Sequence, residues 1–462
     1  MNMKPLRIFI FPIITFCLFS LVLSHTLASQ NLERRAFLGV STVVLNDSLR
    51  TLADFPAGDG VYITIIHNGG TAQTAGLRDG DIITKINETV ISSPQELSQT
   101  MQSLSAGTEF KFSYYRNAGE FTETVIAQTW PEPEHFDNRY LEVPYDNGYL
   151  RAVLSTPRNR ENPPVVYFIQ GLGCGSIYYL QSYHPYKRIP AQFIEAGYAV
   201  FFIEKPGAGD SRDTPACSEI SFAYELRAFQ TGYEFLKTLD GIDTGEIYLF
   251  GHSFGGVHAP ILAEEFHPKG VVVYGTVLRA WMDYLIELRR YQGVWMGGDY
   301  ADIKDSMHDI RRTYYQLFYN NKTPKELFRE EPYKTVLQER LGYQGEGETI
   351  IGGRHYTFHV EANRVNLARH WKNTHSRVLA IYAEADIEAL FPYDHERIAE
   401  VVNYYRPGTA EFWLYPDTDH ALVKVGSLMD GWKIRSEGNY AQSMQESYNE
   451  QVIKDVIRWM KK

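Results

Sequence analysis

Apolar runs alternate with amphipathic stretches over most of the C-terminal part of the chain. Several runs are continuous and rich in β-branched and aromatic residues, which is typical of strands buried on both faces of a parallel sheet. Strands are predicted at residues 164–169, 198–203, 246–250, 271–274, 378–382 and 411–415. Because helical stretches separate them, the pattern predicts an α/β fold with a mostly parallel sheet and helices on both of its faces.

This alternation stops after Val277, where polar, aromatic-rich sequence of helical character continues as far as Arg377. Helices are predicted at residues 281–291, 302–319 and 325–337. These helices make the segment too long and too regular for a connecting loop, so we expect a helical cap at about residues 279–376. Its aromatic residues include Trp281, Tyr284, Trp295 and Tyr314. These side chains could line a substrate pocket, but aromatic residues at helical spacing more often form a core, which we favour here.

Residues 35–128 follow a different pattern, in which turns of Gly, Asn and Asp separate short apolar runs. Only residues 93–104 look helical. There Ser93 can cap a helix, Pro94 suits its first turn, and Glu96 can reach back to the cap. A helix is therefore predicted to start at Ser93.

Three motifs in this region resemble those of a PDZ domain of the kind found in bacterial periplasmic serine proteases. They are Phe37-Leu38-Gly39-Val40, Gly69-Gly70-Thr71-Ala72-Gln73-Thr74-Ala75-Gly76-Leu77 and Gly80-Asp81-Ile82-Ile83-Thr84-Lys85-Ile86-Asn87. The resemblance implies that Leu38, Gly39 and Val40 form a loop that binds the terminal carboxylate of a peptide, while the peptide adds a strand to a sheet edge. The domain could instead only pack on its neighbour or shape its entrance, and both interpretations stay open.

A short connector at residues 129–137 separates this PDZ-like domain, residues 35–128, from an α/β domain of residues 138–462. Its Trp130-Pro131-Glu132-Pro133-Glu134 segment is stiff, because each proline fixes its own φ and pushes the preceding residue to extended geometry. A chain of 462 residues is also too long for one ordinary domain, so two folded domains are expected.

The N-terminus has the pattern of a targeting segment. Lys4 and Arg7 precede an apolar run at residues 8–23, and Thr26-Leu27-Ala28 then offers small residues for cleavage. We predict a signal peptide, residues 1–28, that is cleaved after Ala28, and export to the periplasm or outside the cell. The alternative is a retained membrane anchor, because the run nearly reaches the ~18–20 apolar residues that span a bilayer.

The clearest chemical signal is the G-x-S-x-G pentapeptide Gly251-His252-Ser253-Phe254-Gly255, which lies between an apolar strand and helix-competent sequence. A sharp strand-to-helix turn holds its serine in strained dihedrals, and the flanking glycines let strand and helix approach. The positive end of the helix dipole would favour negative charge there. Ser253 is therefore a candidate nucleophile, which needs a base and an acid to orient that base.

Candidates for the acid and the base follow two later strands. Asp386 follows the strand at residues 378–382, and His420 follows the last strand. The order Ser, Asp, His is that of α/β-hydrolases, and the sequence from Asn147 onward resembles that superfamily. The resemblance implies that Ser253 is the nucleophile, Asp386 the acid and His420 the base. The rivals weighed against them are Glu384, Glu388, Asp417 and Asp419 for the acid, and His252 and His258, which lie on or beside the turn, for the base.

An oxyanion hole is expected from the N–H of Phe254 and from a glycine-rich loop, Gln170-Gly171-Leu172-Gly173-Cys174-Gly175. This loop resembles the His-Gly-x-Gly loop of the family with Gln170 in place of histidine, which leaves the Leu172 N–H as the second donor. The segment Glu204-Lys205-Pro206-Gly207-Ala208-Gly209-Asp210-Ser211 resembles the next loop of the family, although arginine is common at the place of Pro206. We expect this second loop to have a structural role.

The chain has three cysteines. Cys17 lies in the targeting segment, whereas Cys174 lies in the first of these loops and Cys217 shortly after the second, so both are expected at the carboxyl edge of the predicted sheet. In an exported protein we expect a disulfide between Cys174 and Cys217 that pins the oxyanion loop, with two free thiols as the alternative.

Composition and motifs exclude other functions. A net charge of −11 argues against binding to nucleic acid. Neither a His-Glu-x-x-His helix nor a Cys-x-x-Cys pair is present, so no metal and no cofactor are expected. Gly171, Gly173 and Ser176, with Glu204 after the next strand, could suggest a dinucleotide fold, but the third glycine is missing and the acid comes late.

We therefore expect an exported serine hydrolase that cleaves an ester or a peptide bond through an acyl-enzyme. Similar hydrolases include serine aminopeptidases, dipeptidyl-peptidase-like enzymes and esterases, and the sequence leaves the substrate open. The alternative is a catalytically inactive hydrolase-fold scaffold that acts through peptide binding by the PDZ-like domain. For an active enzyme, the rate should rise as His420 becomes neutral, with a midpoint within about a unit of pH ~6.5.

Overall fold

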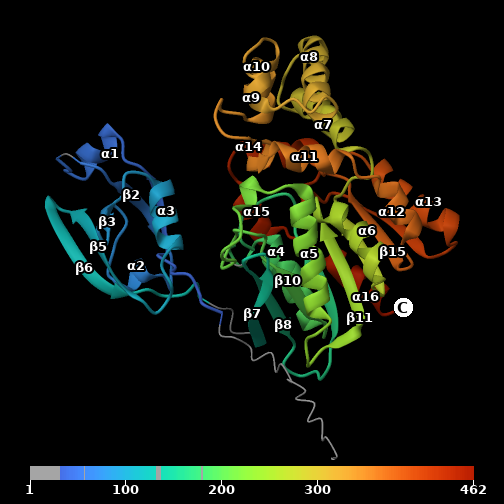
Figure 1. Ribbon diagram of the computed structural model, residues 1–462, viewed down its shortest axis with the longest axis horizontal. Coiled ribbons are helices and arrows are strands. Elements are labelled where there is room, and N and C mark those ends of the chain that lie inside the picture. The colour runs from blue at the N-terminus through green and yellow to red at the C-terminus, as the bar shows by residue number, and fades with distance from the viewer. Residues whose placement is uncertain (1–31, 57, 132–136, 178–179) are drawn as a thin grey trace, which may run out of the picture.

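The computed structural model describes residues 32–56, 58–131, 137–177 and 180–462, which form two folded parts (Figure 1). The N-terminal part carries a mainly antiparallel sheet, and the larger part carries an eight-stranded, mostly parallel sheet. The predicted signal peptide, with its cleavage site at Ala28 and with Cys17, lies outside the described residues. So do residues 132–136 of the predicted connector.

The N-terminal sheet has the order β1-β2-β3-β5-β6, with β4 paired to β3. Its strands are β1 (Val40–Val44), β2 (Val61–Ile66), β3 (Ile82–Ile86), β4 (Thr89–Val90), β5 (Glu109–Arg116) and β6 (Gly119–Ile126), and its helices are α1 (Asp47–Leu52), α2 (Thr71–Thr74) and α3 (Pro94–Gln102). The predicted cap of α3 is confirmed, since the Ser93 side chain accepts a hydrogen bond from the Glu96 N–H. The Glu96 carboxylate, however, accepts from the N–H of Ser92, one residue earlier than expected.

The large sheet has the order β16-β15-β12-β11-β9-β10-β8-β7. Its strands are β7 (Asp137–Tyr145), β8 (Gly148–Thr156), β9 (Pro164–Ile169), β10 (Ala199–Ile203), β11 (Asp243–His252), β12 (Gly270–Tyr274), β15 (Arg377–Ala383) and β16 (Ala410–Tyr415). All neighbouring pairs from β10 through β9 to β16 are parallel, and β7 and β8 add an antiparallel edge. The loops that follow the parallel strands therefore meet at one edge of the sheet.

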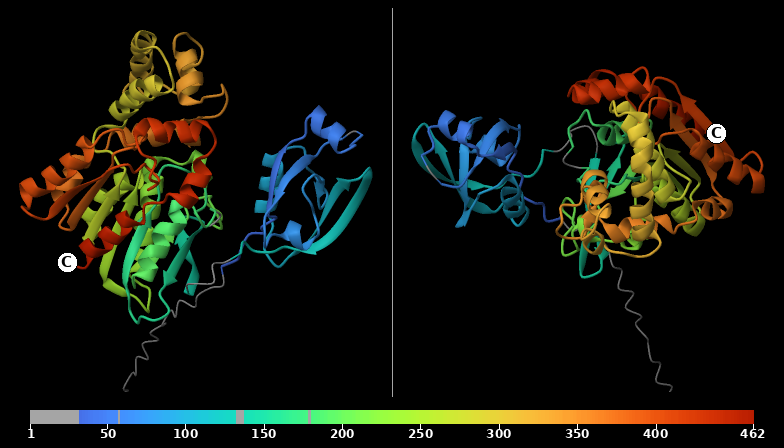
Figure 2. Two further views of the ribbon diagram at one scale, coloured as in Figure 1. Left: turned by 180° about the vertical axis from the view of Figure 1, so that it is seen from behind. Right: turned by 90° about the horizontal axis from the view of Figure 1, so that it is seen from above.

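The central strands are buried on both faces, as their continuous apolar sequence predicts. In β9, Val165, Tyr167 and Ile169 belong to one core cluster, while Val166 and Phe168 belong to the other. Helices α5 (Phe222–Leu236), α6 (Gly255–Phe266) and α13 (Tyr393–Tyr405) pack into the first cluster, and α4 (Pro185–Glu195) and α16 (Glu450–Met460) into the second. Figures 1 and 2 show these helices on the two sides of the sheet.

The insertion between β12 and β15 forms the expected helical cap. Its elements are α7 (Trp281–Trp295), α8 (Tyr300–Phe318), α9 (Pro324–Leu327), α10 (Tyr333–Leu341), β13 (Thr349–Ile350), η2 (Ile351–Gly353), β14 (Arg354–His355), α11 (Tyr356–Asn363) and α12 (Leu367–Asn373). The helix predicted at residues 325–337 is in fact two helices, because Pro332 cannot continue a helix from its N-terminal side. Trp281 and Tyr314 are buried in the core as predicted, whereas Trp295 is only half-buried.

The loop after β10 has the structural role that the sequence suggested. Asp210 is fully buried and forms ion pairs with the Arg151 and Arg34 side chains, at 2.8 and 3.0 Å. Arg34 immediately precedes the PDZ-like part and Arg35 is its first residue, whose N–H also donates to Asp210. This carboxylate therefore ties the start of the N-terminal part to the larger domain. The remaining elements are η1 (Cys217–Glu219), α14 (Leu428–Ser436) and α15 (Tyr440–Glu446).

Candidate active site

Ser253 lies at the sharp turn between β11 and α6. Its φ is +56°, in the left-handed region that non-glycine residues seldom adopt, and its N–H donates to the Tyr274 carbonyl at 2.8 Å. A Cβ atom at Gly255 would come within 2.1 Å of the Ile169 carbonyl oxygen, so only glycine permits this approach of α6 to β9. The strained serine and the required glycine are the features expected of a nucleophile at a strand-to-helix turn.

The glycine-rich loop after β9 lies directly against Ser253. A Cβ atom at Gly171 would be 3.0 Å from the Ser253 Cβ and 3.3 Å from its Oγ. Within the described chain, the N–H groups of Leu172 and Phe254 have no hydrogen-bond acceptor. Both expected oxyanion donors are therefore without an acceptor inside the described chain.

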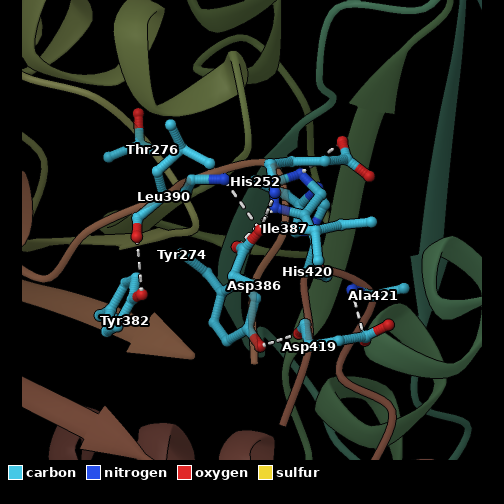
Figure 3. Close-up of polar contacts among 12 residues, drawn as sticks. His252, Tyr274, Thr276, Tyr382, Asp386, Ile387, Leu390, Asp419, His420 and Ala421 are labelled. Atoms are coloured by element: carbon cyan, nitrogen blue, oxygen red, sulfur yellow. Dashed lines mark hydrogen bonds and ion pairs between the residues drawn. The ribbon is translucent and has the colours of Figure 1, made fainter. Parts of the chain in front are cut away.

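Asp386 and His420 form a buried pair. The His420 Nδ1 lies 2.7 Å from the Asp386 Oδ2, and the Asp386 Oδ1 accepts from the N–H groups of Glu388 and Ala389 (Figure 3). Burial raises the pKa of the Asp386 carboxyl, although its contact with His420 opposes this effect. With Nδ1 donating to Asp386, the ring presents Nε2 as the atom that can accept a proton.

Gly275, directly after β12, connects this pair to the turn at Ser253. A Cβ atom at Gly275 would lie 2.9 Å from the His420 Nδ1 and 3.1 Å from the Asp386 Oδ2. The preceding residue, Tyr274, accepts the hydrogen bond from the Ser253 N–H. The three residues predicted from the sequence therefore lie around the ends of β11, β12 and β15, although no hydrogen bond joins the Ser253 Oγ to His420.

The His420 Nε2 instead faces Glu388, whose Oε2 is 3.4 Å away. Burial lowers the pKa of His420, but the charges of Asp386 and Glu388 raise it more, to a net value of about 9. This pKa lies above the value of ~6.5 on which the expected midpoint of the rate rested, because that expectation took no account of the second carboxylate. In the sequence Glu388 is a rival only for the acid, and no local sequence signal places it beside the His420 Nε2.

The other rivals have structural roles or lie apart from the pair. Asp419 is buried and accepts from the N–H groups of Ala421 and Val423, which shapes the turn that carries His420. His258 is buried beside the Glu225 carboxylate, 3.6 Å away. Glu384 is exposed. None of these side chains contacts the ring of His420.

His252, a rival for the base in the sequence, makes positioning contacts in the structure. Its Nε2 lies 2.8 Å from the His420 carbonyl oxygen, and its Nδ1 lies 2.9 Å from the Tyr186 hydroxyl. That hydroxyl accepts from the Gly171 N–H at 2.9 Å. Burial lowers the pKa of His252 to about 3, so its ring is neutral and links the glycine-rich loop to the segment that carries His420. No local sequence pattern indicates Tyr186.

The expected disulfide is present between Cys174 and Cys217, with a Cα–Cα distance of 5.6 Å. It joins the oxyanion loop to η1. In a dinucleotide-binding fold Glu204 would bind a ribose hydroxyl. Here Glu204 is buried and accepts a hydrogen bond from the Ser176 hydroxyl at 2.6 Å. The described residues contain no group of three or more His, Cys, Asp or Glu side chains that could hold a metal ion. No described helix is both long and apolar enough to cross a membrane.

Comparison with family models divides the chain in the same way as the structure. Residues 36–126 match the model of the PDZ domain, and residues 164–299 match the model of the α/β-hydrolase fold. The chain joins a PDZ domain to a domain with the α/β-hydrolase fold. The strand order and the helical insertion after β12 agree with this assignment.

Curated relatives match the PDZ domain. The chain is 32% identical over 96 residues to the serine protease Do-like HtrA of Lactococcus lactis, an alignment that covers 20% of this chain and 24% of that protein. It is 29% identical over 94 residues to the magnetosome formation protease MamE of Paramagnetospirillum magneticum, covering 20% of this chain and 13% of that protein. A probable periplasmic serine protease of Haemophilus influenzae is 33% identical over 98 residues, covering 20% and 21%. The chain thus aligns with a quarter or less of each of these relatives.

Solved structures resemble the α/β-hydrolase domain at low identity. Est1E of Butyrivibrio proteoclasticus, solved with ferulic acid, has a TM-score of 0.43 at 14% identity and covers 69% of this chain and 97% of its own. Acylaminoacyl peptidase of Pyrococcus horikoshii has a TM-score of 0.43 at 14% identity, covering 77% and 48%. Monoglyceride lipase of Saccharomyces cerevisiae has a TM-score of 0.44 at 12% identity, covering 71% and 96%.

Proposed function

We propose that this chain is an exported serine hydrolase in which Ser253, His420 and Asp386 act together on an ester or amide carbonyl. The observation that carries the proposal is the buried Asp386–His420 pair beside a strained serine at one edge of the parallel sheet. A histidine that acts as a base requires a carboxylate that orients its ring through Nδ1 and an Nε2 that can turn to the nucleophile, and the Asp386–His420 pair supplies the first of these.

In the proposed reaction, the His420 Nε2 exchanges its contact with Glu388 for a hydrogen bond from the Ser253 hydroxyl. His420 takes the hydroxyl proton as the Ser253 Oγ attacks the carbonyl carbon, and Asp386 stabilises the resulting imidazolium. The N–H groups of Leu172 and Phe254 stabilise the negative oxygen of the tetrahedral intermediate. His420 then protonates the leaving group, and water hydrolyses the acyl-enzyme by the same steps.

Labelling with a fluorophosphonate probe tests the nucleophile. The mature chain should be labelled at one site, and Ser253→Ala should lose both the label and, by analogy with other triads, on the order of 10⁶-fold in kcat. Ser436→Ala is a matched control, because this exposed serine lies on α14. Undiminished labelling of Ser253→Ala would remove the assignment, and absence of any labelling of the folded protein would favour a scaffold that acts through its PDZ domain.

The substrate class is tested by comparing short acyl p-nitrophenyl esters with aminoacyl p-nitroanilides. Turnover of the anilides at rates near those of the esters would identify a peptidase, and cleavage of esters alone an esterase. The relatives that match the PDZ domain are proteases, which supports testing peptides first. A domain that occurs beside a protease in other proteins does not determine the chemistry of this one.

We assign peptide binding to the edge of the PDZ sheet, where β1 has only β2 as its partner in the described sheet. Leu38, Gly39 and Val40 would hold the peptide's terminal carboxylate through their N–H groups, while the peptide pairs with β1. Titration with peptides that differ only in a free or amidated C-terminus tests this, since amidation removes the charge that the loop would bind.

Export rests on the signal peptide predicted at residues 1–28 and on the Cys174–Cys217 disulfide. The proposed domains are residues 35–128 and 138–462, with the connector at 129–137 and the cap at about 279–376. N-terminal sequencing of the protein recovered from the periplasm should begin at Ser29. Recovery of the full chain from membranes would favour the retained anchor.

A further inference from the structure

Two buried cations bind the carbonyl groups of the oxyanion loop. The Lys205 Nζ donates to the Gly171 carbonyl at 2.6 Å and to the Leu172 carbonyl at 3.3 Å. The Arg354 Nη1 donates to the Leu172 carbonyl at 3.0 Å. Both cationic side chains are fully buried. The reaction described above uses neither of them.

The direction of these contacts matters because a peptide unit is planar and trans. The carbonyl of Gly171 and the N–H of Leu172 belong to one peptide unit, so they point in opposite directions. When Lys205 holds the Gly171 oxygen, the Leu172 N–H must point away from Lys205. In the same way, the Leu172 oxygen held by Arg354 fixes the direction of the Gly173 N–H. A cation on the carbonyl also polarises the peptide unit and strengthens its N–H as a donor.

Glu225 of α5 holds the two cations together. Its carboxylate lies 2.6 Å from the Arg354 Nη2 and 3.2 Å from the Lys205 Nζ, and it is itself fully buried. Burial raises the pKa of Glu225, but Lys205 and Arg354 lower it more, so the carboxylate is charged. Burial lowers the pKa of Lys205 to about 8, which leaves the ammonium charged at neutral pH.

The members of this cluster come from distant parts of the chain. Lys205 follows β10 and Glu225 lies in the body of the hydrolase domain, whereas Arg354 belongs to β14 in the cap. The guanidinium of Arg354 also stacks 3.9 Å above the ring of Phe358, which keeps it anchored to its own segment. Through Arg354 the cap therefore binds a carbonyl group of the oxyanion loop.

We propose that Lys205 and Arg354 are positioning residues that hold the oxyanion loop so that the Leu172 N–H points at the oxyanion, and that Arg354 makes this geometry depend on the docked cap. The inference rests on the proposed function of Ser253. This positioning should stabilise the transition state, in which the carbonyl oxygen gains negative charge. It should contribute little to binding of the neutral substrate.

Kinetics of Lys205→Met and Arg354→Met on a p-nitrophenyl ester test the proposal. A small misplacement of a catalytic group costs about 10²-fold, so kcat should fall by about that factor while KM changes little. Arg279→Met is the matched control, because Arg279 also joins the cap to the body, through an ion pair with Asp394 at 3.0 Å, without contacting the loop. Arg354→Lys keeps the charge and one donor, so it should recover part of the lost kcat.

Each rate is divided by the concentration of active sites, measured as the amount of fluorophosphonate bound when labelling is complete. The comparison of kcat values then does not depend on the yield of folded protein. In the double variant Lys205→Met with Glu225→Gln, the net charge of the buried cluster is unchanged, so no uncompensated charge is left to destabilise the fold. Circular dichroism checks that this variant is folded. Affinity for an alkyl boronate, which forms a tetrahedral adduct on the serine, should fall in parallel with kcat/KM.

The outcomes separate the two proposals. If Ser253→Ala loses the label but the folded double variant and Arg354→Met keep the parent kcat, the positioning role is overturned and the nucleophile stands. A loss confined to KM, or an equal loss in Arg279→Met, would also overturn the positioning role. If Ser253→Ala keeps the label, the proposed function itself fails, whatever the cluster variants do.

Discussion

Replacement of Glu388 by glutamine should make the enzyme faster at neutral pH. A histidine acts as a base only when it is neutral, and the pKa of His420, the proposed base, is raised to about 9. Because kcat/KM reports the free enzyme, its midpoint should lie near that value, and only about 1% of His420 is then neutral at pH 7. Glu388 contributes to this shift from 3.4 Å, and its side chain is 44% exposed.

The size of the effect follows from that distance. With water-like screening, a unit charge at this separation contributes about 1.2 kcal/mol, or about one pKa unit. Glu388→Gln should therefore move the midpoint of kcat/KM from about 9 to about 8. The neutral fraction at pH 7 rises to about 9%, so kcat/KM should increase about ninefold at pH 7 and scarcely at all above pH ~10.

The assay is the pH profile of kcat/KM on a p-nitrophenyl ester between pH ~6 and ~10.5. Glu384→Gln is the matched control, because it removes a nearby exposed carboxylate that has no contact with His420. An unchanged midpoint in Glu388→Gln, or an equal shift in Glu384→Gln, would refute the electrostatic reasoning. A lower kcat/KM at every pH would instead mean that Glu388 takes part in the reaction.

The same pKa shift affects stability. A histidine whose pKa is higher in the folded state than its unfolded value of ~6.5 binds a proton more tightly when folded. Its contribution is fully present below pH ~6.5 and is lost as the pH rises through about 9. Thermal unfolding of Glu388→Gln should therefore show a smaller loss of Tm between pH ~6 and ~10 than the parent protein.

Three further changes have defined outcomes. Gly275→Ala places a methyl group 2.9 Å from the His420 Nδ1 at a φ of +60°, so kcat should fall by about 10²-fold; a parent-like kcat would contradict the described packing. Removal of the disulfide by Cys174→Ser with Cys217→Ser should lower the free energy of unfolding by about 2–4 kcal/mol in urea titrations, and an unchanged midpoint of unfolding would count against its role as a crosslink. Tyr186→Phe keeps the ring but removes the hydroxyl that the oxyanion loop donates to, so kcat should fall about tenfold with little change in KM; a loss in KM alone would point to a substrate contact.

Local sequence was sufficient wherever a few neighbouring residues carry the whole constraint. The turn at Ser253 needs an apolar strand, a serine and close-packing glycines within a short segment, and the sequence shows all of these residues together. The same holds for the buried strands, whose continuous apolar runs differ from helical periodicity. The order of Asp386 and His420 after two later strands followed from the resemblance to the α/β-hydrolases, and the structure pairs these two residues.

Tertiary structure alone decided the contacts that tune the site. Glu388 and Glu384 are similar carboxylates in one loop, and only the path of that loop places Glu388 beside the His420 Nε2, so the raised pKa of His420 could not be read from the sequence. Arg354 is 182 residues from Leu172 in the chain and reaches it only because the cap docks on the body. Periodicity and motifs describe neighbours along the chain, whereas pKa values and donor directions depend on charges and carbonyls that packing brings together.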